Sequence, residues 1–585
     1  MTVDVSTARR SVRIANCSGF FGDRLSAASE MVSGDIDVLT GDWLAELTML
    51  ILHKQRSRNP DAGYASTFLL QMDQVLATCM EKGIKVVTNA GGLNPAGCAE
   101  KVRDIAVRLG LDVKVAHIEG DDLMPRVDGL REQLRNLDTG APLVGNPVTA
   151  NAYLGGWGIA AALRAGADVV VCPRVTDAAL VEGAAAWWHD WEADQWDALA
   201  GAVVAGHVIE CGTQATGGNY TWFHEIPDPS KPLGFPIAEV AADGSSVITK
   251  HPGTGGVVNV GTVTAQLLYE IGAPEYLNPD VVTRFDTIRL TNDGPDRVRI
   301  SDVRGLPAPP SAKVCVNLEG GFRNRMSFVL SGLRQREKAE WLEAALFARL
   351  GGKERFADVD VRFVEAPSDA PTQEQASGRL HISVKSPDER LVGRAFSSAA
   401  IELALANYPG FFATGGPSEA QSYGVYWPAL VDAEEVHEVV VLPTGSRLPV
   451  SAPPRSLVLA PGHERVGSAG AVDSGGAGVG PGRGEPLGAH FAARSGDKGG
   501  NANVGIWARD EAGYEWLRAH LTVDAVRALL PEARGLDVRR FELANIHALN
   551  FVIVGLLGEG VASSTAFDAQ AKGLGEYLLS RVWRD

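Results

Sequence analysis

Short apolar segments alternate with helical patterns through the first third of the chain, and this alternation constrains the fold more than any other feature. The segments lie at residues 12–19, 36–42, 84–92, 112–120 and 167–177. They are apolar throughout, which is typical of strands that are covered on both faces. A helical pattern that starts at Ala65 ends at Lys82-Gly83, a common helix stop. We therefore predict an α/β fold over residues 10–204, with a parallel, Rossmann-like sheet and helices on both faces.

The composition changes after about residue 205, where glycine, proline and threonine become more frequent. Candidate strands with alternating polarity begin at Thr283, Ala312 and Arg379, and a candidate helix begins at Ala395. We predict a mixed α+β region over residues 205–455 that packs against the first region.

A glycine- and alanine-rich stretch with almost no large apolar residues follows the mixed region. Such a segment buries too little surface to offset its ordering entropy, so residues 456–487 are predicted to form a flexible linker. The remaining residues, 488–585, show strand, turn, strand, helix, strand and helix patterns in that order. This order predicts a small α+β domain.

The charge and cysteine content exclude several classes of protein. There are 54 Lys and Arg against 71 Asp and Glu, a net charge of −17, which argues against a nucleic-acid partner. The six cysteines form no CxxC pair and the twelve histidines no HExxH motif, so we expect reduced thiols and no metal site. No run of roughly 18 apolar residues and no secretion signal is visible. We expect a cytoplasmic protein with no membrane partner.

The candidate strands of the first region all end in small or polar residues. In a parallel sheet, ligands bind outside the carboxyl ends of the strands. We therefore expect a substrate site there, although such residues also simply make turns. The candidates are Asn16, Ser18, Gly19, Asp42, Asn89, Gly91, Asn94, Arg174, Thr176 and Asp177.

Two acids among these candidates are assigned to catalysis, Asp42 and Asp177. Asp177 lies three residues after Arg174 at the start of a predicted helix. It either caps that helix or acts as a general base while Arg174 holds an anionic group.

The densest polar segment of the chain lies at residues 208–223. Glu210 is a candidate acid or base, and Cys211 a candidate nucleophile, although a buried, unreactive cysteine is the commoner outcome. Gln214, Thr216 and Gly217 are candidate substrate contacts.

Two glycine-rich turns have the flexible backbone that binds phosphate, and each is also explained as an ordinary turn. The first, after Lys250, includes the candidate contact Gly255. The second runs from Arg494 to Asn501 and carries two cations. The aromatic run from Trp187 to Trp196 is explained by helix packing or a subunit interface, or by the wall of a pocket.

Several of these segments in one order resemble the acyclic terpene utilisation (AtuA-like) family. They include NCSGFFGDR, TNAGGLNPAGCA, PRVTDAALV and ECGTQATGGN, and the resemblance covers residues 12 to about 450. The segments ARSGDKGGNANVGI and NIHALNFVIVGLLGEGV resemble the ferredoxin-like domain that accompanies this core.

The resemblance implies a role in the breakdown of acyclic terpenes, in which branched acyl groups are processed as coenzyme A thioesters. The sequence identifies no cofactor, and a coenzyme A thioester is a candidate substrate. It leaves two hypotheses open. The first is an enzyme of hydratase, lyase or hydrolase type that acts on an acyl-CoA or its acid. The second is a non-catalytic partner that binds an acyl-CoA or assembles a carboxylase and hydratase pathway. A homo-oligomer is the default expectation for either.

Overall fold

The computed structural model describes residues 9–451, 453 and 479–584. Its contacts divide the chain into two compact units. Unit 1 comprises Met1–Asn317, Tyr426–Val561 and Asp568–Asp585, and unit 2 comprises Leu318–Val425 and Ala562–Phe567. Residues 456–478, most of the predicted linker, lie outside the described residues.

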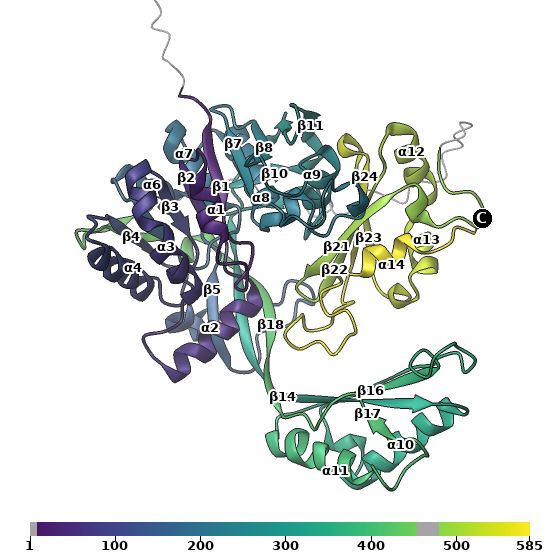
Figure 1. Cartoon of the computed structure of the whole chain (residues 1–585). Helices are drawn as coiled ribbons and strands as arrows, with labels where there is room; N and C mark the ends of the chain where they lie inside the picture. Colours follow the sequence, from purple (N-terminus) through teal and green to yellow (C-terminus); the bar gives the residue numbers. More distant parts are fainter. Residues whose placement is uncertain (1–8, 452, 454–478, 585) are drawn as a thin grey trace, which may run out of the picture. The chain divides into compact units, whose positions relative to one another are not determined.

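Five parallel strands form the middle of the main sheet of unit 1 (Figure 1). In spatial order they are β1 (Val12–Asn16), β2 (Val38–Gly41), β3 (Lys85–Thr88), β6 (Val169–Val171) and β4 (Val115–Glu119). Each lies within one of the five apolar segments of the sequence. The prediction of these strands is therefore confirmed.

Antiparallel strands extend this sheet at both edges, to eleven strands within the described residues. Beside β1 lie β7 (Pro236–Val240), β8 (Ser246–Lys250), β12 (Val298–Ser301) and β11 (Arg289–Asn292), and beside β4 lie β19 (Val439–Val441) and β20 (Arg447–Pro449). The largest sheet is therefore mixed, and the predicted parallel, Rossmann-like sheet is not confirmed. The physical reason is that later segments cover the two edges that the parallel strands leave unpaired.

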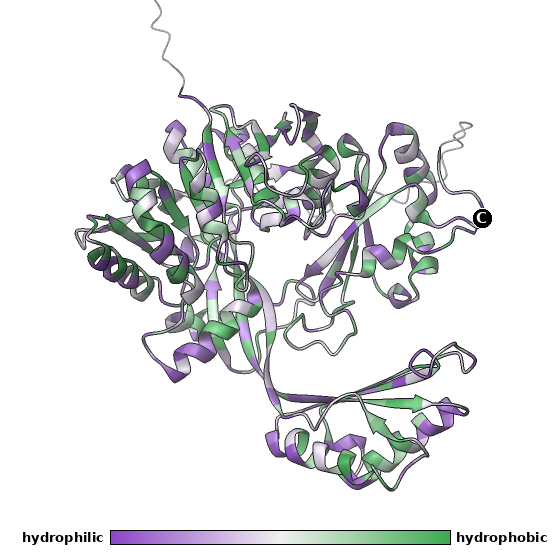
Figure 2. Ribbon diagram, in the orientation of Figure 1, coloured by the Kyte–Doolittle hydropathy of each residue, from purple (hydrophilic) through white to green (hydrophobic). Residues whose placement is uncertain are grey.

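Helices cover both faces of the sheet. One face carries α1 (Ala27–Ser33), α3 (Ser66–Lys82) and α4 (Pro95–Leu109), and the other carries α6 (Trp157–Arg164), α7 (Ala179–His189) and α8 (Trp196–Ile209). Successive residues of β2 enter different cores, Val38 with α6 to α8 and Leu39 with α1, α3 and α4. Figure 2 shows the apolar colour along these strands. Burial on both faces explains why their sequences do not alternate.

The rest of the unit 1 core surrounds the carboxyl ends of the parallel strands. It contains α2 (Glu46–Arg58), α9 (Val260–Leu267), β5 (Pro147–Ala152) and a small antiparallel sheet of β9 (Glu275–Leu277), β10 (Val281–Arg284) and β13 (Arg304–Pro307). β5 pairs with β14 (Ser311–Ser331), which begins in unit 1 and ends in unit 2.

The C-terminal part of unit 1 follows the predicted alternation of strands and helices, but the predicted middle helix is two helices and the predicted third strand is two strands. Its antiparallel sheet has the order β21 (Ala492–Lys498), β22 (Asn501–Trp507), β24 (Ala548–Ile553) and β23 (Val538–Leu543). Its helices are α12 (Glu511–His520), α13 (Val523–Leu529) and α14 (Leu574–Leu579). Buried Asn503 binds this domain to the core, because its Nδ2 donates to the carbonyl of Leu268 at 2.7 Å.

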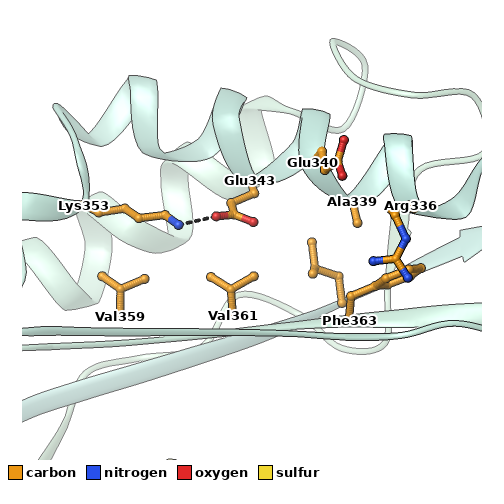
Figure 3. Close-up of a pocket in the computed structure, with 9 residues that line it drawn as sticks. Arg336, Ala339, Glu340, Glu343, Lys353, Val359, Val361 and Phe363 are labelled. Atoms are coloured by element: carbon orange, nitrogen blue, oxygen red, sulfur yellow. Dashed lines mark hydrogen bonds and ion pairs between the residues drawn. The ribbon is translucent and has the colours of Figure 1, made fainter.

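Unit 2 is a sheet covered by helices, and the sequence pattern does not distinguish it from the rest of the predicted mixed region. Its elements are the later part of β14, β15 (Asp358–Val364), β16 (Ser377–Ser386), β17 (Phe412–Ala413), part of β18 (Gln421–Asp432), α10 (Gln335–Leu350) and α11 (Phe396–Glu402). Figure 3 shows Val359, Val361 and Phe363 of β15 pointing toward α10 across a cavity of about 430 Å³. Lys353 and Glu343 form an ion pair at its side.

Over the part of the chain that the structure describes, the helices are too short or too polar to cross a membrane.

Candidate functional site

A cavity of about 510 Å³ opens at the carboxyl ends of the parallel strands. Gly19 follows β1, Asp42 follows β2, and Arg174, Thr176 and Asp177 follow β6, and all five line the cavity. Carboxyl ends of parallel strands meet at one edge of a sheet, so residues far apart in sequence converge there. Glu210, Cys211 and Gln214 complete the predicted residues that line this cavity.

Arg174 is the fixed cation of the cavity. Its side chain is buried, and its Nη1 donates to Asp177 Oδ1 at 2.8 Å and to the carbonyl of Leu44 at 3.1 Å. The guanidinium lies 4.3 Å from the ring centre of Tyr153. Burial lowers the pKa of Arg174, but the opposing effects of Asp177 and Tyr153 leave it well above its usual range. Arg174 is therefore a permanent charge beside the site.

Asp177 faces Arg174 instead of capping the helix that follows it. The capping position of α7 belongs to Ala178, which makes no side-chain hydrogen bond. Asp177 therefore does not cap α7, which is one of the two roles that the sequence leaves open. Asp177 lines the cavity beside Arg174.

Asp42 is held by Asn89, which does not itself line the cavity. Asn89 Nδ2 donates to Asp42 Oδ1 at 2.5 Å, and its Oδ1 accepts from the backbone N–H of Trp43 at 2.8 Å. Burial and the charge of Asp177 raise the pKa of Asp42 well above its usual range, against the effect of Arg174. Asp42 therefore favours its neutral form.

Glu210 is the second buried acid, directly after α8. His207 Nδ1 lies 3.1 Å from Glu210 Oε1, but at an angle that makes no hydrogen bond, and burial lowers the pKa of His207 to about 4. Burial, Asp177 and Glu270 raise the pKa of Glu210 well above its usual range. Glu210 Oε2 has no hydrogen-bond partner among the described residues. Glu210 is therefore a neutral acid beside a neutral imidazole.

Cys211 lines the cavity beside Glu210, but its surroundings oppose ionisation. Burial, together with Glu210 and Glu270, raises the pKa of this thiol well above its usual range. A nucleophilic cysteine needs the opposite, a thiolate stabilised by nearby positive charge.

The C-terminal domain supplies one wall of the cavity through the end of β21 and the turn after it. Lys498 Nζ donates to the carbonyl of Glu270 at 3.0 Å, and burial and Lys313 lower the pKa of Lys498 to about 8. Burial and Glu270 raise the pKa of Asp497 to about 7. The turn with two cations thus reaches the cavity, and it brings Asp497 and Lys498, which are not among the predicted site residues.

A charged cluster forms the wall near α2. Tyr153 donates its hydroxyl to Glu46 Oε1 at 2.9 Å, and Lys313 Nζ lies 3.8 Å from the same oxygen. Burial raises the pKa of Glu46, but Lys313 and Arg174 outweigh this effect and lower it to about 2. Glu46 is therefore ionised and offsets the two cations.

Three predicted polar contacts do not line this cavity, and each binds backbone among the described residues. Asn16 Nδ2 donates to the carbonyls of Ile209 and Glu210 at 2.7 and 2.9 Å. Ser18 donates to the carbonyl of Phe20, and Thr216 donates to that of Gly234. Asn16 thereby fixes the segment that carries Glu210.

The other four predicted contacts also lie outside the lining of the cavity. Asn94 caps α4 by accepting from the N–H of Gly97 at 2.9 Å. Gly91 and Gly255 make close backbone contacts, to the carbonyls of Cys172 and Pro232. Gly217 has a φ of 117° and lines a neighbouring smaller cavity.

Several residues of the site had no signal in the sequence. Glu46, Tyr153, Glu270, Lys313 and Lys572 all line the cavity. They come from helices and strands whose approach to the site depends on tertiary packing. No local motif marks them.

No group of three histidine, cysteine or acidic side chains within the described ranges is arranged to hold a metal ion. The absence of a metal and of a cofactor stays a prediction.

Two family comparisons match the chain. The profile of the acyclic terpene utilisation family protein AtuA matches residues 12–442. The profile of the AtuA ferredoxin-like domain matches residues 486–583. The comparison with curated proteins gives no match.

Proposed function

The chain belongs to the acyclic terpene utilisation family of AtuA, and we propose that it is an enzyme that adds water to, or removes water from, a branched acyl-CoA thioester or its free acid. The observation that carries this proposal is the meeting of Asp177 and Glu210 in one cavity. Acid and base groups with different protonation states at one site are the requirement for proton-transfer chemistry.

The environments of these two acids differ in one respect that decides their roles. Asp177 is paired with the permanent charge of Arg174. Glu210 pairs with no lysine or arginine of the described chain, and burial raises its pKa. Asp177 is therefore assigned as the base and Glu210 as the acid.

Hydration of a carbon–carbon double bond next to the acyl carbonyl then proceeds as follows. The water oxygen bonds to the β-carbon as one of its protons passes to the carboxylate of Asp177. The proton of Glu210 passes to the α-carbon. Proton exchange with solvent then returns Asp177 to its carboxylate form and Glu210 to its protonated form. Dehydration is the reverse of these steps.

The walls suit a substrate with an apolar and an anionic part. Phe20, Leu44 and Tyr276 give the cavity apolar surface for a branched hydrocarbon. Lys313 and Lys498 supply positive charge for a carbonyl oxygen or a carboxylate. A cavity of about 510 Å³ has the size of a small-molecule site and holds the acyl part of a thioester.

Hydrolysis through a cysteine intermediate is the less favoured chemistry. The raised pKa of Cys211 leaves a protonated thiol, which is a weak nucleophile. We therefore assign the hydratase or lyase reaction ahead of hydrolysis.

The experiment has two steps. Thermal shift with branched and straight acyl-CoAs, coenzyme A and the free acids identifies the ligand, because a ligand that binds only the native state raises Tm. Mass spectrometry then follows deuterium incorporation at the α-carbon of that ligand in heavy water.

We expect incorporation with the unaltered enzyme and a loss of at least about 100-fold in Asp177→Asn and Glu210→Gln. Cys211→Ser is the matched control and retains the reaction. Loss in Cys211→Ser with release of free coenzyme A would instead favour a hydrolase.

Binding without any conversion would favour the second hypothesis, a non-catalytic acyl-CoA-binding or scaffolding partner. The aromatic run offers that hypothesis no support, because Trp191 is buried and Trp187, Trp188 and Trp196 pack against the core.

A further inference from the structure

A second cavity, of about 350 Å³, lies beside the first and shares Asn219 and Lys572 with it. It lies between the core and the C-terminal domain of unit 1. Tyr220 and Phe223 line one side, and Arg494 and Lys572 line the other. The proposed reaction uses neither cation.

Arg494 is the unusual residue of this second cavity. Its side chain is 5% exposed, and Gln214 is its hydrogen-bond acceptor. No carboxylate of the described chain lies within ion-pair distance of it, and burial lowers its pKa. Glu270 is not paired with Arg494 but also favours its charged form, and burial raises the pKa of Glu270 itself. A buried guanidinium that is offset only in this way is energetically unfavourable unless a ligand supplies negative charge.

Lys572 brings a second positive charge to the same place. The guanidinium of Arg494 and the Nζ of Lys572 lie 4.2 and 4.4 Å from the ring centre of Tyr269. Lys572 Nζ lies 3.9 Å from Asp497 Oδ1, and burial raises the pKa of Asp497 to about 7. Asp497 therefore offsets the charge of Lys572 only in part at neutral pH.

Glu576, the acid that lines this second cavity, does not neutralise the two cations. Glu576 is exposed, and its Oε1 accepts the hydroxyl hydrogen of Thr221 at 2.8 Å. No ion pair joins Glu576 to either cation within the described residues. Two positive charges thus face a largely apolar chamber that adjoins the acid and base of the first cavity.

We propose that Arg494 and Lys572 form an anion subsite that binds a phosphate or carboxylate group of the substrate, away from the reacting atoms. The substrate is then an elongated anion whose reacting end lies beside Asp177 and Glu210. Guanidinium and ammonium groups together suit both oxyanions, because each donates several charge-assisted hydrogen bonds. The subsite rests on the proposed function only for the identity of the reacting end.

Calorimetric titration of the full chain tests the subsite without turnover. The probes are inorganic pyrophosphate and coenzyme A for a phosphate, glutarate for a carboxylate, and pantetheine as the uncharged comparison. The variants are Arg494→Met, Arg494→Lys and Lys572→Met. Arg509→Met is the control, because Arg509 also stacks on an aromatic ring, Trp222, but lies outside both cavities.

We expect at least one anion to bind with Kd below about 1 mM and pantetheine to bind more weakly. Arg494→Met and Lys572→Met should each weaken the anion by at least about tenfold. Arg494→Lys should restore part of the affinity, and Arg509→Met should leave it unchanged. Tighter binding of pyrophosphate and coenzyme A than of glutarate identifies a phosphate, and the reverse identifies a carboxylate.

Unchanged anion affinity in folded Arg494→Met and Lys572→Met would overturn the subsite, and so would the failure of every anion to bind the unaltered chain. These outcomes are distinct from failure of the proposed function. Anion binding that depends on Arg494, without conversion of any thioester, would leave the subsite standing and remove the hydratase assignment. Conversion of a thioester with an unchanged KM in Arg494→Met would leave the hydratase assignment standing and remove the subsite.

Discussion

Glu210 and Asp177 differ at the scale of single residues because of what lies next to each carboxyl group. Asp177 has the guanidinium of Arg174 at 2.8 Å, whereas Glu210 has a neutral histidine. Arg174 and Lys498 lower the pKa of Glu210 only weakly, because neither pairs with it, so burial favours the protonated acid. The same feature that makes Glu210 a proton donor also makes it costly to keep in the folded protein at higher pH.

Glu210→Gln is therefore expected to stabilise the fold at mildly alkaline pH. The folded pKa of Glu210 is raised above its ordinary value of 4.5. Between these two values the folded state holds a proton that the unfolded state has released, so the unaltered protein loses stability as pH rises through this window. Glutamine cannot ionise, so the variant does not lose stability as pH rises through this window. We expect Tm to rise by about 1–3 °C in the variant, measured by calorimetry.

The difference in Tm should shrink to zero as pH falls below 4.5, where both states of the unaltered protein bind the proton. Glu340→Gln, at an exposed position of α10, is the control and should show no such difference. A Tm difference between Glu210→Gln and the unaltered protein that does not change with pH would contradict the raised pKa of Glu210.

At the scale of elements, the close contact of α8 with the start of α7 brings the two acids together. A Cβ added to Gly206 of α8 would lie 2.8 Å from the Cα and the carbonyl oxygen of Ala178. Ala178 directly follows Asp177, and Gly206 precedes Glu210 by one helical turn. The absence of a side chain at Gly206 therefore sets the separation of Asp177 and Glu210.

Gly206→Ala is expected to push α8 away from α7 and to reduce both stability and catalysis. Overpacking of this kind costs about 1–3 kcal/mol of the free energy of unfolding. Urea denaturation and the deuterium assay measure the two effects. Gly129→Ala in α5 (Val127–Leu130) is the control, because its added Cβ meets no atom within 4 Å. Full activity in Gly206→Ala would show that this contact does not position the acids.

The sequence predicts the parallel strands and the C-terminal domain, because local patterns determine them. Apolar runs such as the one that contains Val38 and Leu39 show strands buried on both faces, and Gly83 stops α3 as expected. The antiparallel edges of the sheet and the separate unit 2 are not predictable in this way. They depend on which distant segments pair, and β14 passes from unit 1 to unit 2 without a break in its strand pattern.

The strand ends allow the sequence to predict which side chains meet at the cavity. Asp42, Arg174 and Asp177 meet because parallel strands end at one edge. Asn16 ends β1 and Asn89 follows β3 at the same edge, but the amide of Asn16 donates to two backbone carbonyls and that of Asn89 donates to Asp42. Side-chain partners are set by tertiary packing, which no local pattern records.

At the scale of the whole molecule, the C-terminal domain completes the cavity. Asn503 is buried at the contact, where its Oδ1 accepts from the N–H of Glu270 at 2.9 Å and its Nδ2 donates to the carbonyl of Leu268. Glu270 and Lys498 line the cavity from the two sides of this contact. The domain is therefore a part of the site in addition to its own fold.

Asn503→Ala is expected to weaken ligand binding although Asn503 does not line the cavity. The change removes the partners of the buried carbonyl of Leu268 and the partly buried N–H of Glu270, at a cost of about 1–3 kcal/mol for each buried group. Calorimetric titration with the ligand found by thermal shift measures the binding.

Asn94→Ala is the matched control for Asn503→Ala. It removes a helix cap worth about 1 kcal/mol and is expected to lower Tm without changing ligand affinity. Weaker ligand binding in Asn94→Ala would support the sequence-based prediction that Asn94 contacts the substrate. Unchanged ligand binding in Asn503→Ala would show that the contact of the C-terminal domain through Asn503 is not needed for the site.

The central claim is that the cavity holds Glu210 as a neutral acid beside Asp177, and difference infrared spectroscopy tests it most directly. A protonated carboxyl group absorbs at a different frequency from a carboxylate, so subtraction of the Glu210→Gln spectrum isolates this one residue. We predict a neutral carboxylic acid signal from Glu210 at neutral pH that disappears only as the solution is made alkaline. A carboxylate signal at neutral pH would contradict the assignment of Glu210 as the acid.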